Sequence, residues 1–135
     1  MIKRKTLAFI FTVLLSAPII GLVFMLLEGS TIREVPALIA FVSMYTIPIT
    51  LLWGIPSSIL SDKVNKYFSN KKRVCTALIT HLFFGTSFVI IFMLIFDSRF
   101  ILTDNNAGDA YFLVASSLIS SIGWWMDEIL RVYFK

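Results

Sequence analysis

Long uncharged apolar runs constrain the fold of this chain more than any other feature of its sequence. Residues 6–27, 36–60 and 74–96 contain no Asp, Glu, Lys or Arg. Each run exceeds the about 20 residues that a helix needs to cross a hydrocarbon core about 30 Å thick. We therefore predict one transmembrane helix in each of the three runs.

A fourth transmembrane helix is predicted over residues 110–131, where the sequence is more polar. Asp127 and Glu128 arrive before this segment has run a full span, but aromatic and aliphatic residues continue on both sides of them. The connections between the four runs are short, which lets neighbouring helices pack as antiparallel hairpins. The predicted fold is all-α, a four-helix transmembrane bundle of two hairpins in a single domain over residues 1–135.

The composition excludes an ordinary water-soluble domain. Hydrophobic residues make up 58% of the chain, above the about 45–50% that is usual in soluble domains. A soluble fold of this size could not bury so much apolar surface. The formal net charge of +4 does not indicate a nucleic-acid partner, because the basic residues flank the apolar runs instead of forming a solvated basic surface.

The start of the chain has two interpretations. Lys3, Arg4 and Lys5 precede the first apolar run, and a signal peptide begins in the same way. However, the run is longer than the apolar core of a typical signal peptide, and no convincing small-residue cleavage motif follows it. We predict that residues 6–27 remain in the protein as a membrane anchor.

The distribution of basic residues assigns the orientation, since Lys and Arg near span ends collect on the cytoplasmic side. The N-terminus, the connection over residues 61–73 and the C-terminus hold ten of the twelve basic residues. The other two connections hold Arg33 and Arg99. Both termini are therefore predicted to be cytoplasmic, in a multi-pass protein of the cell membrane. The ten basic residues are Lys3, Arg4, Lys5, Lys63, Lys66, Lys71, Lys72, Arg73, Arg131 and Lys135.

The connection over residues 61–73 is basic and also has an apolar periodicity. Leu60, Val64, Tyr67 and Phe68 recur at helical spacing, which predicts a short helix at the depth of the lipid headgroups. The basic residues that end this connection are expected to contact anionic lipids of the cytoplasmic leaflet. These anchor residues are Lys71, Lys72 and Arg73.

The two other connections, over residues 28–35 and 97–109, are too short for an extramembrane domain. Pro36 suits the first turn of the second helix, where its missing N–H costs nothing. The stretch over residues 104–109 is typical of a turn, and Asp109 is a candidate N-cap of the fourth helix.

Three ionisable side chains inside the predicted spans are candidates for function, because polar groups are costly in a bilayer. His81, Asp127 and Glu128 lie at similar depths from the cytoplasmic side. If the third and fourth helices pack side by side, His81 is within reach of one carboxylate. The functional interpretation is a proton-linked site, since imidazole titrates near neutral pH. The structural interpretation is a stabilising hydrogen bond, or carboxylates that reach the headgroups.

Small polar residues recur along one side of the second and of the fourth predicted helix. Such residues let helix backbones approach closely and let hydroxyls bond across the interface; they can instead line a translocation pathway. Pro48 and Pro56 remove backbone hydrogen bonds and predict a kink in the second helix, beside Trp53 and Gly54. The candidate packing or cavity residues are Ser43, Thr46, Thr50, Gly54, Ser57, Ser116, Ser117, Ser120 and Ser121.

No catalytic template fits the sequence. Cys75 is the single cysteine, which permits neither an internal disulfide nor a multi-cysteine metal site, and we predict it to be a small packing residue. A His-Glu-x-x-His array, a glycine-rich phosphate loop and a Gly-x-Ser-x-Gly elbow are absent. The chain is predicted not to be an enzyme and to bind neither cofactor nor metal.

Several features are shared with one group of proteins along the whole chain. They are the lysine-rich N-terminus, Ile47-Pro48 and Gly54-Ile55-Pro56 in the second span, and the basic connection that ends in Lys71-Lys72-Arg73. With them the chain resembles an uncharacterised family of small four-span membrane proteins of Gram-positive bacilli, which includes prophage-borne copies. No activity is assigned to that family, so the resemblance implies a location and a topology but no site residues.

Two functional hypotheses follow. The first is an accessory, regulatory or immunity-type protein that acts through helix–helix contacts, as a homo-oligomer or with a larger membrane partner. The small-residue tracks and the missing catalytic motifs favour it. The second is a small dimeric transporter or proton-coupled exporter, motivated by His81, the acidic pair and the prolines of the second span. Small multidrug exporters depend on an acidic residue in their first span, and residues 6–27 contain none.

Overall fold

All regular structure in the described residues is helical. The computed structural model describes residues 2–29, 31–96 and 107–134. No strand occurs in these ranges, so the predicted all-α class is confirmed. Residues 104–106 of the predicted turn lie outside the described ranges, and Asp109 lies inside a helix instead of at its N-cap. The α-helices are α1 (Ile2–Glu28), α2 (Val35–Ile49), α3 (Ile55–Val64), α4 (Asn70–Phe96) and α5 (Ala107–Tyr133).

The second predicted span is a continuous helical rod made of α2, the π-helical turn η2 (Thr50–Gly54) and α3. In a regular α-helix the ring of Pro56 would clash with the carbonyl group four residues earlier. A π-helical turn shifts the hydrogen bonds by one residue, and the Ile55 N–H donates to the Thr50 carbonyl. The change of register thus lies between Pro48 and Pro56, while the kink itself stays a prediction.

The basic connection contains more helix than its sequence predicts. The 3-10 turn η3 (Asn65–Tyr67) extends α3, and α4 already begins at Asn70. The short helix predicted around Val64 is therefore a continuation of α3 and not a separate element. At the other end of the rod, the 3-10 turn η1 (Ile32–Glu34) leads into α2, and Pro36 occupies the first turn of α2, as predicted.

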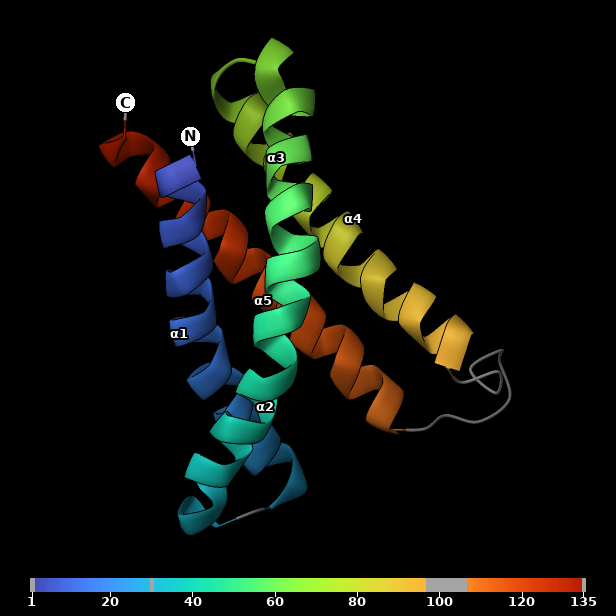
Figure 1. Cartoon of the computed structure of the whole chain (residues 1–135). Helices are drawn as coiled ribbons and strands as arrows, with labels where there is room; N and C mark the ends of the chain where they lie inside the picture. Colours follow the sequence, from blue (N-terminus) through green and yellow to red (C-terminus); the bar gives the residue numbers. More distant parts are fainter. Residues whose placement is uncertain (1, 30, 97–106, 135) are drawn as a thin grey trace.

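Both termini and the connection between α3 and α4 lie at the same end of the molecule, whereas the connection between α1 and α2 lies at the other end (Figure 1). α5 packs against α1 and against α4. α1 also packs against α2, and α4 also packs against α3. α1 and α4 therefore each contact both the α2–η2–α3 rod and α5, which makes the arrangement a bundle.

The polarity of the bundle is the reverse of that of a soluble protein. Among the described side chains, seven apolar ones are buried, against ten polar or charged ones. Large apolar side chains such as Leu14, Met44, Leu52 and Ile95 are instead more than half exposed. A soluble domain would bury such residues. This surface fits a lipid environment.

Three helical segments are long and apolar enough to cross a membrane, namely Lys3–Leu27, Ile32–Tyr67 and Lys71–Ile95. They correspond to the first three predicted spans and are consistent with a membrane protein. The described part of α5 is not among these segments. Its serines and the acidic pair lower its apolar character, as the sequence suggests.

Small residues bring α5 close to its two neighbours. A Cβ atom placed on Gly85 of α4 would lie 1.8 Å from Ser120 Oγ, 2.9 Å from Ser120 Cβ and 3.3 Å from the Ser116 carbonyl oxygen. Only a residue without a side chain fits there. Further along α5, a Cβ atom on Gly123 would lie 3.6 Å from Thr12 of α1, which is an ordinary contact.

This difference yields a matched pair of substitutions. Gly85→Ala should lower the free energy of unfolding by about 1–3 kcal/mol, because the new methyl group forces α4 and α5 apart. Gly123→Ala should leave it nearly unchanged. Equilibrium unfolding of the purified protein in mild detergent measures both. Equal effects of the two substitutions would contradict the close α4–α5 contact.

Candidate functional site

Seven charged side chains meet at the end of the bundle that holds both termini. We call this cluster the ionic network. It takes residues from α1, α3, α4 and α5, so each of these helices contributes at least one charge. The network consists of Arg4, Lys5, Asp62, Arg73, Asp127, Glu128 and Arg131.

Lys5 and Asp127 form the buried centre of the ionic network. Their side chains are each only 4% exposed, and Lys5 Nζ lies 2.8 Å from Asp127 Oδ2. Lys5 Nζ also lies 2.8 Å from Asp62 Oδ2 and donates to Ser58 Oγ at 2.6 Å. Removing an ion from water costs several kcal/mol, roughly, unless partners replace its hydration. The ammonium group of Lys5 has such partners on α3 and α5.

Two arginines surround this centre and link the same two carboxylates. Arg4 Nη2 lies 2.5 Å from Asp62 Oδ2, and Arg4 Nε lies 3.1 Å from Asp127 Oδ1. Arg131 Nη2 forms an ion pair with Asp62 and lies 3.6 Å from Asp127 Oδ2. Asp62 and Asp127 are thus each shared by three cations. Neither carboxylate is free to act as a nucleophile or a general base.

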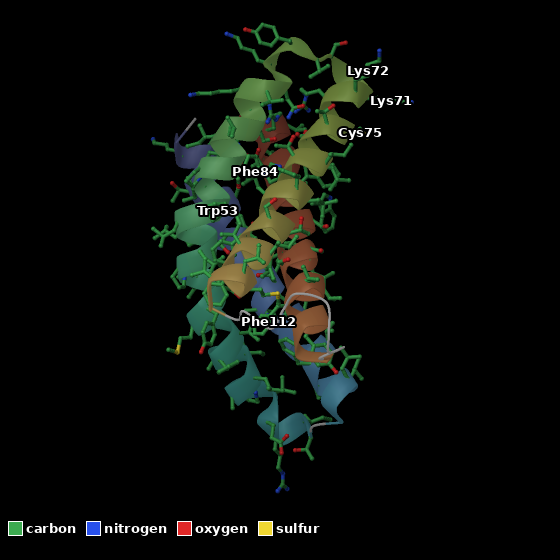
Figure 2. All side chains as sticks on the ribbon, turned by 90° about the vertical axis from the view of Figure 1, so that its right-hand side faces the viewer. Trp53, Lys71, Lys72, Cys75, Phe84 and Phe112 are labelled. Atoms are coloured by element: carbon green, nitrogen blue, oxygen red, sulfur yellow. The ribbon has the colours of Figure 1, made fainter. Side chains whose placement is uncertain are left out.

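Glu128 joins α4 to the ionic network through Arg73. The guanidinium group donates from Nη1 and Nη2 to the two carboxylate oxygens at 2.8 Å and 2.7 Å. Such a bidentate pair fixes both distance and orientation. The prediction that Arg73 faces lipid together with Lys71 and Lys72 is therefore wrong for Arg73, because Glu128 turns it toward α5. The two lysines are exposed at the start of α4 (Figure 2).

His81 lies inside the bundle, but its hydrogen bond is not the one expected from sequence. It is 8% exposed, and Nδ1 bonds to the Ala77 carbonyl oxygen of its own helix at 2.9 Å. Among the described residues, Asp127 and Glu128 pair with cations and not with His81. The expected histidine–carboxylate pair is replaced because Lys5 and Arg4 of α1 bind Asp127, and Arg73 of α4 binds Glu128.

Five of the candidate small polar residues bond within their own helical segment in the described structure. Ser43, Ser57, Ser116, Ser117 and Ser121 each donate to a carbonyl group three or four residues earlier in the chain. Ser120 lies against Gly85 of α4, where its small size allows the two helices to approach closely. Thr46 is buried, and the buried Thr50 Oγ1 has no partner among the described residues. Gly54 contacts Thr50.

The interhelical hydrogen bond that the structure does place between the second and third spans comes from an indole. Trp53 Nε1 donates to the Phe84 carbonyl oxygen at 2.9 Å, and its ring lies 5.5 Å from that of Phe88. Figure 2 shows Trp53 and Phe84 at about the same height on neighbouring helices. Trp53, beside the predicted kink, thus joins the α2–η2–α3 rod to α4 through this hydrogen bond and a contact with the ring of Phe88.

Cys75 is exposed, which contradicts its predicted role as a packing residue. It lies two residues after Arg73 of the ionic network, on the outer side of α4 (Figure 2). No group of His, Cys, Asp and Glu able to hold a metal ion occurs in the residues that the structure describes.

Asp62 is the central residue that sequence reasoning missed. The signal was present, because Asp62 is the one acidic residue in an otherwise basic connection. Arg4, Lys5 and Arg131 were likewise interpreted only as markers of orientation. A sequence does not show that residues 4, 62 and 127 meet, since long-range pairing depends on how the helices pack.

Two hollows lie on the bundle away from the ionic network. A shallow depression of about 320 Å³ lies on α5, lined by Leu113, Val114, Ser117, Leu118 and Ser121. A void of about 10 Å³ lies between α1 and α5, beside Ile20 and Tyr111. Neither reaches the network. The ionic network therefore holds the ends of α1, α3, α4 and α5 together by charge.

Asp127 and Glu128 should therefore differ in their importance for stability. Asp127→Asn removes the more deeply buried of the two carboxylates that lie 2.8 Å from Lys5 Nζ and should cost about 3–5 kcal/mol. Glu128→Gln should cost about 1–2 kcal/mol, because Arg73 is partly exposed and can regain water. Unfolding of each variant in detergent tests this order. A loss at Asp127 no larger than the loss at Glu128 would mean that the buried centre is not formed.

Comparisons with known proteins give no family or function for the chain. No protein-family model matches the chain, and neither curated proteins nor solved structures give a significant match. The resemblance to the four-span proteins of Gram-positive bacilli therefore stays a prediction.

Proposed function

We propose that the chain is a four-span protein of the plasma membrane that acts through helix–helix contacts as an accessory, regulatory or immunity-type subunit. One observation carries the topology: the ionic network joins the start of α1, the end of α3, the start of α4 and the end of α5. These four points therefore lie at one end of the bundle. If the first three segments cross a bilayer, α5 has to return across the same thickness.

The polar composition of α5 does not oppose this topology. With 27 residues the helix is about 40 Å long, more than a hydrocarbon core of about 30 Å. Ser120 packs against Gly85, Gly123 packs against Thr12, and Asp127 is buried among cations. These three residues of α5 thus face its neighbours and need not contact lipid acyl chains.

The end of the bundle that holds the ionic network is assigned to the cytoplasm. Lys63, Lys66, Lys71 and Lys72 lie beside it on the α3–α4 connection, whereas the other described connection contains Arg33 and Glu34. Basic residues next to spans remain on the cytoplasmic side. With an even number of spans, both termini are then cytoplasmic.

The surface of α5 supports the assignment of helix–helix contacts. Its depression places Ser117 and Ser121 one turn apart between larger apolar side chains. The hydroxyl groups of these two serines bond to carbonyl groups of α5 at 2.8 Å. They leave a small, low surface of the kind that lets a second transmembrane helix approach. A further copy of the chain or a larger membrane protein fits this role.

The transporter hypothesis has less support. Proton-coupled transport needs a titratable group that faces a pathway and can exchange its proton. Asp127 and Glu128 are held by cations, and the histidine of α4 is bonded to its own helix. No described feature favours this alternative over a subunit that works by contact.

Site-specific photocrosslinking in native membranes tests the proposed function. A photoreactive phenylalanine analogue at Ser117 or Ser121 should give a crosslinked product, because these positions line the proposed contact surface. The same analogue at Leu52 or Ile79, which are 73% and 61% exposed on other faces of the bundle, should give none. If two copies of the chain carry different epitope tags, a crosslinked product that contains both tags is a second copy, and a product with one tag is another protein.

Two crosslinking results would contradict the proposed function. If no position gives a product, and the chain purifies as a monomer without a partner, then it does not act through helix–helix contacts. A product of equal yield at all four positions would indicate random collision and would also contradict the proposal.

A further inference from the structure

The connection between α3 and α4 carries a concentrated positive charge that the ionic network does not use. We call residues 63–72 the lysine tip. This segment contains four lysines and neither Asp nor Glu, so its formal charge is +4. All four lysine side chains are exposed. They are Lys63, Lys66, Lys71 and Lys72.

The structure separates the basic residues at this end into two groups. Arg4, Arg73 and Arg131 pair with carboxylates inside the ionic network. The lysines of the tip form no ion pair with any described residue. Asp62, the acidic residue nearest to the tip in sequence, is bound by cations of the network. The charge of the lysine tip is therefore not compensated within the described parts of the protein.

Apolar and aromatic side chains are exposed beside these lysines. Tyr67 is 88% exposed, and Val64 and Phe68 are each 45% exposed. In Figure 2 Lys71 and Lys72 project from the end of the bundle, away from the helices. Lysines next to exposed aromatic and aliphatic side chains are typical of segments at the membrane–water interface, where the rings enter the headgroup layer and the ammonium groups contact phosphates.

We propose that the lysine tip is a binding surface for the anionic phospholipid headgroups of the cytoplasmic leaflet, which it recognises as a layer of phosphate charge. The proposal rests on the membrane topology proposed above. Lysine favours this partner because its compact charge on a flexible stem binds anions without a fixed geometry. The tip is also continuous with two helices that are apolar enough to cross a membrane, which places it next to headgroups. An acidic protein segment is the competing partner.

Lipid selectivity of the full chain in a bilayer tests the proposal. The protein is reconstituted in phosphatidylcholine vesicles that contain spin-labelled phosphatidylglycerol or spin-labelled phosphatidylcholine. Electron spin resonance then gives the relative association of each lipid with the protein surface. The parent should prefer phosphatidylglycerol by roughly twofold or more, and the preference should fall as salt rises.

Two quadruple variants provide the matched comparison. Substituting all four tip lysines by glutamine should abolish the preference, whereas substituting them by arginine should retain it, because only the charge matters. Both variants should fold like the parent, since the lysines are exposed and unpaired. Circular dichroism and thermal unfolding check this. Arg33→Gln, at the other end of the bundle, should leave the preference unchanged.

Several outcomes overturn the proposal. An equal association of both lipids with the parent would show that the tip binds no anionic headgroups, as expected if its partner were an acidic protein segment. A preference that survives the glutamine variant would place lipid selectivity elsewhere. A chain that alkaline carbonate extracts from the vesicles would contradict the proposed topology and this inference together. Retention in the bilayer without a headgroup preference would contradict this inference alone.

Discussion

An ionised side chain in a low-dielectric interior requires a partner, and the arrangement of this bundle depends on how the chain meets that requirement. Lys5 and Asp127 come from opposite ends of the sequence and bury each other's charge. Asp62 and the arginines of α1 and α5 complete their surroundings. Because each helix supplies a charge that another helix needs, the ends of α1, α3 and α5 cannot separate without leaving a buried ion unpaired.

Away from the ionic network, small side chains and close backbones hold the helices together. Many large apolar side chains lie on the surface, while Gly85, Gly123 and Ser120 lie where α5 meets its neighbours. In lipid there is no hydrophobic force between helices, so packing of this kind and the hydrogen bond from Trp53 to α4 supply the attraction. The ionic network thus determines which helix ends pack together, and the small residues determine how closely the helices approach.

The helical class and the first three long apolar segments could be predicted because length and charge placement depend only on local sequence. The polar segment of α5 was harder, since its serines and Asp127 make sense only beside Gly85 and Lys5. The sequence indicates Asp127 and Glu128 as candidates, but the partners it suggests for them are His81 or the lipid headgroups and not the cations that bind them. Sequence reasoning missed Asp62, and it assigned Arg73 to the lipid. Those errors share one cause: the partner of a buried charge lies far away in sequence, and a local pattern does not identify it.

The coupling free energy between Lys5 and Asp127 tests most directly whether this buried pair holds the helix ends together. A double-mutant cycle of Lys5→Met and Asp127→Asn, measured by reversible unfolding in bicelles, isolates it from the separate effect of each substitution. The ionic network predicts a coupling of at least about 1.5 kcal/mol, with the double variant more stable than the sum of the single losses implies. Effects that add to within about 0.5 kcal/mol would show that the two residues do not interact, and the account of the bundle would fail.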